Sequence, residues 1–496
     1  MTRRGLLQLG AGLACGLTAS AAPDLPDELI TEAYEKAASL NVLAALNPKV
    51  FPGYWSVCAD GKGFGYGNTY PSLDGHQMTD ALLWLGQVEA VKANWNYVRS
   101  FQRKDGCLPL AILPSQAGKD IGPKGFPGVV AENGGLYTHW VPGNPLAALA
   151  SPTYIQNADV IFRHTLDRQW LAAEIGSVNL AADFLASLTS PEGIVKGGGY
   201  YVERPSRLES DGVTQSHAID AFRRTAALNR VTGDRKTAAR YEHLAERIEH
   251  AFVTRFWVQD HFAEYRHPER GFVARHGLTD SDWSALAMGV ATRQQRAALW
   301  PRLKSENKFY YGEMPTGIAT EPATYEAWEF TYPDRMDLAA MGRVWYVESA
   351  ARARMGDGEG LVDALRRVCQ AGRQSGYYWR ERYNATGGYG AQKYCEYPAN
   401  LIRIVQRFLL GVDLKLDGSV ELSPTVPANF WKLGFGQTLS WRDRQLTYRM
   451  RLEGVTGTYT GGTPQRLAIR FAGGRRVQVN LPAASAKTPH AFEVRA

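Results

Sequence analysis

The sequence predicts a mainly α protein: a toroid of six helical hairpins followed by a small antiparallel β domain. From about residue 27 to residue 411, apolar residues recur at helical spacing in about eleven or twelve segments that form pairs. Each pair has one short and one long connection, which suits a ring whose long loops gather on one face. After residue 411, apolar and polar residues alternate instead. A chain of 496 residues can hold a large barrel and one accessory domain.

The first 22 residues are expected to be an export signal and not part of the fold. Arg3 and Arg4 begin a twin-arginine pattern, residues 10–17 form a short apolar run, and residues 19–21 form a small-residue cleavage site. The apolar run is too short to cross a bilayer, and no later run is long enough. We therefore expect a periplasmic or secreted protein, with a lipoprotein attached at Cys15 as the less favoured alternative.

The charge and the cysteines exclude several classes of protein. The formal charge of +7 becomes +5 without Arg3 and Arg4, and it is spread along the chain with no basic run typical of nucleic-acid binding. No dinucleotide, P-loop or zinc-protease motif is present, so we expect no cofactor, no metal and no nucleic-acid partner. The mature chain keeps four cysteines, whose spacing is not that of a metal site: Cys58, Cys107, Cys369 and Cys395. We expect all four to be thiols, and a disulfide between Cys369 and Cys395 is the alternative.

The expected helices follow one another along the barrel part. The first spans residues 28–46, and an aromatic loop separates it from the second, over residues 80–100. Residues 105–150 are rich in glycine and proline and should form a long excursion that walls a cleft, because long loops in compact domains are usually functional. The remaining helices are expected over residues 154–168, 170–188, 214–231, 235–257, 282–292, 293–303, 335–354, 358–371 and 398–410.

The β domain is expected over residues 412–496. Residues 412–416, 420–422, 445–451 and 467–471 alternate apolar and polar side chains, and turns rich in Gly, Pro, Asn and Asp separate them. We expect this domain to be a structural cap on the barrel, with a separate sugar-binding module as the alternative.

One stretch near the end of the helical part places an acid between aromatic residues. Glu381 lies between Trp379 and Tyr383, and Arg380 and Arg382 flank it directly. Neighbouring cations favour an ionised carboxylate, which a general base requires, and the two aromatic residues could contact a substrate. The alternative is a surface acid paired with one of the arginines.

This stretch resembles the late motif of the six-hairpin, (α/α)6-barrel glycosidases, which include trehalase, processing-glucosidase and α-L-rhamnosidase-like families. Those families carry Trp-x-Glu-x-Tyr/Trp-Asp/Asn, often with Thr-Gly shortly after. The matching residues here are Trp379, Glu381, Tyr383, Asn384, Thr386 and Gly387. The rhamnosidase-like families also end their barrels as this chain does, with Leu-Leu-Gly at 409–411, Asp-Gly at 417–418 and Leu-Ser-Pro at 422–424. The resemblance implies that Glu381 is the general base of an inverting glycoside hydrolase.

A second carboxyl group must protonate the leaving oxygen. Asp211 and Glu209 lie just before the helix expected from Thr214, and their like charges favour a protonated form of one of them. Trehalase-like enzymes carry Glu-Ser-Gly-x-Asp at the comparable place, with the Asp as acid. This chain reads Glu-Ser-Asp-Gly-Val, so Val213 occupies the position of that acid. We expect Asp211 to be the acid and Glu209 the alternate; the other interpretation is that either one caps the helix.

Other residues are candidates for substrate contacts. In this superfamily an early loop supplies substrate hydrogen bonds through an Asp near aromatic residues, a role that fits Asp74 with His76. Trp328 and Trp140 are candidates to stack on a sugar, although such rings more often fill a core. Glu326 or Glu329 is a reserve for the second carboxylate.

These observations favour an exported, exo-acting, inverting glycoside hydrolase that cleaves an oligo- or polysaccharide with two carboxylates. A polysaccharide lyase with a Tyr or His base on a helical toroid is the first alternative, since some lyases share this architecture. A non-catalytic glycan-binding protein is the second. The sequence does not specify the sugar, the linkage or the anomer.

Overall fold

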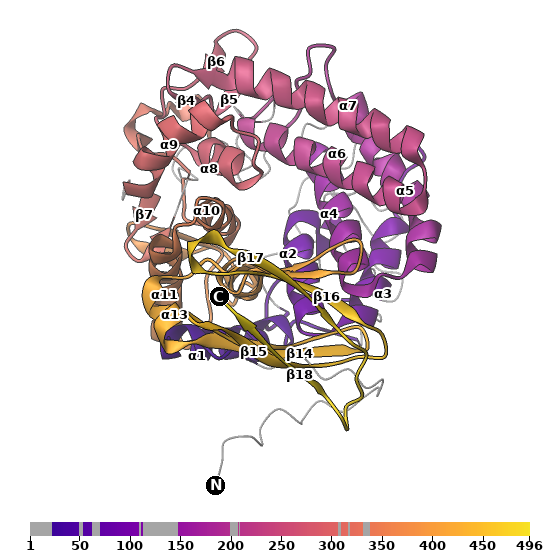
Figure 1. Cartoon of the computed structure of the whole chain (residues 1–496). Helices are drawn as coiled ribbons and strands as arrows, with labels where there is room; N and C mark the ends of the chain where they lie inside the picture. Colours follow the sequence, from indigo (N-terminus) through magenta and orange to yellow (C-terminus); the bar gives the residue numbers. More distant parts are fainter. Residues whose placement is uncertain are drawn as a thin grey trace.

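The computed structural model describes residues 22–48, 53–61, 70–108, 111–112, 147–198, 207, 209–305, 309–315, 318–330 and 338–496. Figure 1 shows a ring of helices with the β strands of the C-terminal part on one side of it. The export signal expected in the first 22 residues, and most of the excursion expected over residues 105–150, lie outside the described residues.

Six helices of the described part form the inner wall of the ring. Each packs against the next in chain order, and the last packs against the first, which closes the ring. These helices are α2 (Ser72–Trp84), α4 (Ala147–Thr165), α6 (Gly212–Thr232), α8 (Asp280–Ala287), α10 (Gly342–Arg354) and α12 (Glu396–Ile404). A closed ring of six inner helices is the (α/α)6 barrel, so the predicted fold class is confirmed.

Each outer helix follows an inner helix in the chain, except for the first outer helix, which precedes the ring. These are α1 (Glu28–Lys36) with the π-helical turn Ala37–Val42, α3 (Val88–Arg99), α5 (Arg168–Ser187), α7 (Arg235–Ala251), α9 (Arg293–Ser305) and α11 (Gly358–Gln374). The outer helix α11 buries one apolar stripe, whereas every residue of the inner helix α12 is buried. The short links have the caps that sequence predicts: Gly233 ends α6 with a φ of 90°, and Asp234 accepts a hydrogen bond from Thr237 to begin α7.

Some predicted helix boundaries were wrong. The helix expected over residues 80–100 is two helices, α2 and α3, because Gly86 has a φ of 77° and turns the chain between them. The helix expected over residues 235–257 changes to a π-helical turn at Phe252–Phe256 and then to strand β3 (Trp257–Val258).

The C-terminal part contains two four-stranded sheets. One has the order β13 (Phe435–Trp441), β14 (Arg444–Arg451), β15 (Gly454–Thr460) and β18 (His490–Arg495), all antiparallel. The other has the order β11 (Val412–Leu414), β12 (Val420–Leu422), β16 (Gln465–Arg470) and β17 (Arg476–Leu481). Here β12 and β16 pair in parallel, which corrects the fully antiparallel prediction. A long connection that carries the whole β13–β15 meander joins these two strands, and a parallel pair needs such a crossover.

Hydrogen bonds join the β domain to the barrel. Arg442 donates to the carbonyls of Arg163 and His164 at the end of α4, at 2.7 and 3.2 Å. The buried amides of Gln406 and Gln437 donate to each other, both at 2.9 Å. The domain is therefore fastened to the carboxyl ends of the inner helices α4 and α12.

The four cysteines of the mature chain are buried thiols. The Cys369–Cys395 disulfide that the sequence left open is therefore not formed. Within the described ranges, no helix has the length and apolarity needed to span a bilayer.

Candidate active site

The amino ends of the inner helices gather charged residues on one face of the ring. All six inner helices run the same way, because each returns through an outer helix, so their first turns lie at one end. Asp74 lies in the first turn of α2, Arg343 in that of α10 and Glu396 in that of α12. The positive end of each helix dipole favours carboxylates at this face.

Glu381 is held by the turn that follows it. It lies in the connection between α11 and α12 and is only 7% exposed. Its Oε2 accepts a hydrogen bond from the Ala391 amide at 3.0 Å, and its Oε1 lies 3.3 Å from Nε of Arg382. Gly390 has a φ of 75°, and a Cβ there would come within 2.6 Å of Oε2. The Gly-rich turn thus fits the carboxylate, and the interpretation of Glu381 as a surface acid is wrong.

Asp74 lies beside an arginine that another acid already holds. The Arg343 guanidinium donates to Glu396 through Nη2 and Nε, at 2.9 and 3.1 Å, and the Arg343 amide also donates to Glu396. The nearer oxygen of Asp74, Oδ1, is 3.8 Å from Nη2 of Arg343 and has no hydrogen-bond partner in the described part of the chain. Asp74 therefore interacts with the Arg343 guanidinium more weakly than Glu396 does.

Burial above all, together with the negative charges of Glu396 and Glu381, raises the pKa of Asp74 to about 7, while Arg343 and a hydrogen bond from Tyr394 oppose the rise. Glu381 is among the charged groups that act on Asp74. The start of the first inner helix and the loop before the last one thus carry two acids with different environments. Asp74 tends to keep its proton near pH 7. Glu381 accepts a hydrogen bond from an amide and lies beside an arginine.

Asp211 and Glu209 lie at the start of α6, so Asp211 is on the same face of the ring as Asp74. Asp211 is fully buried and caps α6, since its Oδ1 accepts the hydrogen bond of the Thr214 amide. It lies near the guanidinium of Arg207, while Glu209 is exposed. This is the capping role that the sequence left open.

A buried ion network next to Asp211 was missed at the sequence level. Arg207 donates to Glu264 through Nε and to Asp280 through Nη1, both at 2.8 Å. His276 lies between Glu264 and Glu329, with its Nε2 3.2 Å from the latter. These five charged groups are fully buried and join the start of α8 to the loops around it. No local spacing signals this network, because its members are scattered between residues 207 and 329.

The predicted sugar contacts around Glu326 and Trp328 are already engaged with the protein. Glu326 pairs with Arg270 at 3.1 Å and accepts a hydrogen bond from Nε1 of Trp328 at 2.6 Å. The Arg270 guanidinium covers one face of the Trp328 ring at 4.5 Å. The ring of His267 also contacts this half-buried ring, with 5.2 Å between the two centroids.

One of the two aromatic predictions in the late motif needs correction, and the other stays a prediction. Trp379 is fully buried, and its Nε1 donates to the Val368 carbonyl at 3.1 Å, so it packs the core and is no sugar platform. Tyr383 is half-buried, and its hydroxyl accepts a hydrogen bond from the Arg380 amide at 2.9 Å. Trp140 lies outside the described residues.

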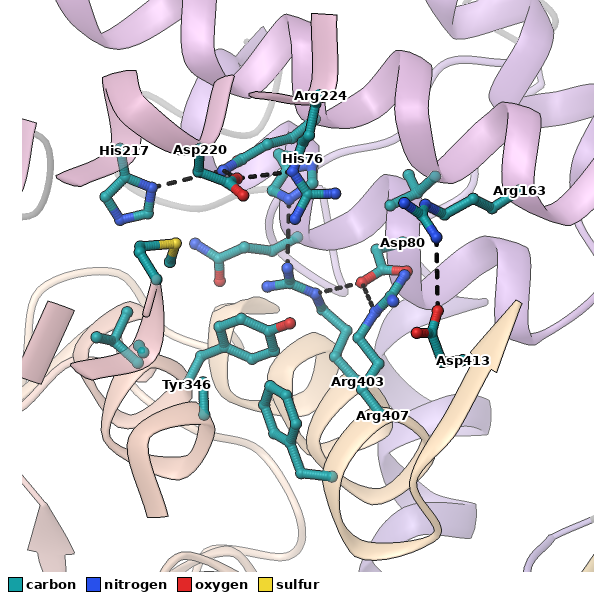
Figure 2. A pocket seen from close by; sticks show the side chains of 18 of the residues that line it. His76, Asp80, Arg163, His217, Asp220, Arg224, Tyr346, Arg403, Arg407 and Asp413 are labelled. Atoms are coloured by element: carbon teal, nitrogen blue, oxygen red, sulfur yellow. Dashed lines mark hydrogen bonds and ion pairs between the residues drawn. The ribbon is translucent and has the colours of Figure 1, made fainter. Parts of the chain in front are cut away.

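His76 lines the cavity inside the ring, beside Arg403 (Figure 2). Its Nδ1 is 2.6 Å from Oδ1 of Asn157, and its Nε2 accepts from Arg403 at 3.3 Å. Burial and Arg403 lower the pKa of His76 to about 3, so the ring is neutral and donates through Nδ1. The predicted Asp74–His76 substrate-binding pair is therefore not formed, because both His76 nitrogens are used inside the protein.

Below Asp74, the inner helices surround a cavity of about 510 Å³. Asp80 accepts hydrogen bonds there from Arg403 at 2.8 Å and from Arg407 at 2.8 and 2.6 Å (Figure 2). On the other wall, Asp220 accepts from Gln156 at 3.1 Å and Arg224 at 2.7 Å. These pairs connect α2 to α12 and α4 to α6, so they fix the inner helices that carry the candidate acids.

Comparisons with known proteins show the fold and no assigned family. No family model and no curated protein sequence matches the chain. Among solved structures, the chain is similar to a GH78 family rhamnosidase of Bacillus sp. GL1, with 12% identity and a TM-score of 0.64 over 88% of this chain and 40% of that one. An α-L-rhamnosidase from Dictyoglumus thermophilum matches with 10% identity and a TM-score of 0.63 over 96% and 49% of the two chains. A GH63 mannosylglycerate hydrolase from Thermus thermophilus matches with 12% identity and a TM-score of 0.52 over 76% and 99%.

The chain thus spans less than half the length of the two rhamnosidases. At identities this low, the likeness concerns the fold alone. It confirms the six-hairpin (α/α)6 architecture that the late motif implies.

Proposed function

We propose that the protein is a glycoside hydrolase in which Asp74 is the general acid and Glu381 the general base. The observation that carries the proposal is the pair of carboxyl groups at the amino ends of the inner helices, one favouring its protonated form and the other bound by an amide and an arginine. Hydrolysis of a glycoside needs one carboxylic acid and one carboxylate in this relationship.

Asp74 replaces Asp211 as the proposed acid for a physical reason. A general acid must hold a proton at the working pH and must release it to the leaving oxygen. Asp211 is engaged as the cap of α6, where its Oδ1 accepts the hydrogen bond of the Thr214 amide, and it lies near Arg207. The Oδ1 atom of Asp74, by contrast, has no hydrogen-bond partner in the described part of the chain.

The proposed reaction is a single displacement. Glu381 removes a proton from a water molecule, and the water oxygen attacks the anomeric carbon. Asp74 gives its proton to the glycosidic oxygen as the bond between that oxygen and the anomeric carbon breaks. The products are the free sugar with inverted anomeric configuration and the released alcohol, and a later proton exchange with solvent restores both carboxyl groups. Inversion and action at chain ends are proposed from the resemblance to the six-hairpin families.

The substrate class is proposed to be an oligo- or polysaccharide met outside the cytoplasm. The rhamnosidase and mannosylglycerate hydrolase names of similar structures support a glycoside, and the twin-arginine pattern at Arg3 and Arg4 supports export. Because the chain spans less than half of the rhamnosidases, their sugar is not transferred to it.

The test is a screen of the purified protein against aryl glycosides and against plant and bacterial polysaccharides, followed by proton NMR of the first product. Hydrolysis with inverted configuration is expected for at least one substrate. A parallel reaction with inorganic phosphate distinguishes phosphorolysis, which would yield a sugar phosphate. An unsaturated uronate absorbing in the ultraviolet would instead identify a lyase and contradict the proposal.

A further inference from the structure

The β domain carries most of the net positive charge of the chain. Residues 412–496 hold twelve Lys and Arg against six Asp and Glu, a net charge of +6 out of the total of +7. Since Arg3 and Arg4 account for two more, residues 23–411 have a net charge of −1. The expectation that the charge is spread along the chain was therefore wrong. A charge difference of this size between two parts of one chain indicates a partner for the basic part.

Three of these twelve residues lie on one face of strands β16 and β17, which Figure 1 labels, and Arg475 lies in the turn between the two strands. Alternate residues of a strand point to the same side, so Arg466 and Arg470 share a face with their cross-strand neighbours Asn480 and Arg476. Arg470 is paired directly with Arg476, and like charges directly opposite each other destabilise a sheet. A bound anion would remove this repulsion.

Two arginines at this end of the hairpin are available to a ligand. Arg470 and Arg475 are exposed, and neither has an ion-pair partner among the residues that the structure describes. Their neighbour Arg476 pairs with Glu421 at 3.1 Å. Gly473 and Gly474, both at positive φ, form the tight turn that brings these arginines together.

The same face continues into a groove of about 590 Å³ against the barrel. Arg163 of α4 and Lys415 line its far side, and Gln478 and Asn480 supply amide groups along β17. Three carboxylates lie in the groove and pair with its cations: Asp413, Asp417 and Glu421. No aromatic side chain of the described residues lines the groove, so they give it no platform for stacking a neutral sugar.

We propose that this face, the arginine cluster of Arg470, Arg475 and Arg476 with the adjoining groove, binds a segment of an anionic polysaccharide. Arginine forks match carboxylate and sulfate groups, and the amides of Gln478 and Asn480 can bond sugar hydroxyls. The three groove carboxylates disfavour duplex DNA, which carries a charge about every 1.7 Å, but they tolerate one charge per sugar. The site lies on the β domain, away from Asp74 and Glu381, and it does not depend on the proposed hydrolysis.

The experiment is affinity electrophoresis and titration calorimetry of the mature protein with polygalacturonate, using a Glu381→Gln background to keep the polymer intact. Highly methyl-esterified pectin serves as the uncharged polymer, and a sulfated glycan as the second anion. The test variant is Arg470→Ala with Arg475→Ala. The matched control is Lys432→Ala with Arg451→Ala, two exposed basic residues of the same domain whose loss changes the net charge equally.

We expect the protein to bind at least one of the two anionic polymers, with an affinity that falls as salt is added, and to bind methyl-esterified pectin at least tenfold more weakly. The arginine variant should lose at least tenfold in affinity and the control less than twofold, with both retaining the melting temperature of the parent. Equal losses in the two variants would show an effect of net charge alone and overturn the proposal. Equally tight binding of duplex DNA, or no binding to either anionic polymer, would overturn it as well.

Discussion

Arg343 forms two side-chain hydrogen bonds to Glu396, at 2.9 and 3.1 Å, while its Nη2 remains 3.8 Å from Asp74. Two acids, Glu396 and Asp74, therefore face the guanidinium of Arg343. Because Glu396 takes both side-chain hydrogen bonds, Arg343 stabilises the carboxylate of Asp74 only weakly. Tyr394, Glu381 and Cys395 are the other titratable groups that interact with Asp74. Burial, together with this relationship, favours the protonated form of Asp74, whereas an arginine that it did not share would favour the carboxylate.

Replacing Glu396 with Gln should lower the pKa of Asp74. The substitution removes a like charge and leaves the charge of Arg343 to act on Asp74 alone, and an arginine beside a carboxylate lowers its pKa by about 1–3. The acid acts only while protonated, so wild-type kcat/KM should fall as pH rises through about 7. In Glu396→Gln this basic limb should move at least about one pH unit lower. A profile of kcat/KM against pH measures the shift, and an unmoved limb in a folded variant would contradict this account.

Asp74→Asn should stabilise the protein at alkaline pH while it removes activity. The pKa of Asp74 is about 7 in the folded protein and ordinary, about 4, in the unfolded chain. The folded state therefore binds the extra proton between these values, and stability falls as pH rises through that window. The variant lacks this dependence, so its melting temperature should exceed that of the wild type at pH 8 and match it near pH 4. Calorimetry at both pH values is the measurement, and an equal difference at both would count against the assignment.

Asp80 should be a structural residue of the ring. It is fully buried, and although burial opposes ionisation, Arg407 and Arg403 hold its pKa far below the ordinary range. Asp80→Asn leaves two buried guanidinium groups without their carboxylate, a change that costs about 3–5 kcal/mol in buried pairs. Because a depressed pKa contributes stability above the unfolded value, the loss should be constant from about pH 5 to pH 8. Urea unfolding measures it, and the exposed Asp443→Asn is the control.

Asp211→Ala should behave as the loss of a helix cap. Removing an Asp cap costs about 0.5–2 kcal/mol, and the pH dependence of the remaining activity should be that of the wild type. Urea unfolding and a pH–rate profile test both expectations. Loss of the basic limb of the profile in a protein of unchanged stability would restore Asp211 as the general acid.

The sequence predicted what local patterns determine. Helical periodicity and the Trp-x-Glu motif are local, so the ring of hairpins and the position of Glu381 could be inferred from them. The approach of Asp74 to Glu381 could not, because it depends on closure of the ring between its first and last inner helices. Two local signals also misled: the acids before Thr214 form a cap and an exposed residue, and Trp379 packs into the core against Gly372.

The most direct test compares two leaving groups in Asp74→Asn and Glu381→Gln. A 2,4-dinitrophenyl glycoside of the accepted sugar needs no proton on its leaving oxygen, whereas the natural glycoside does. Asp74→Asn should lose about 10²–10⁴-fold in kcat/KM on the natural glycoside and less than about tenfold on the dinitrophenyl glycoside. Glu381→Gln should lose activity on both substrates. If Asp74→Asn is impaired equally on the two substrates, or if Glu381→Gln remains active, the assignment of acid and base is wrong.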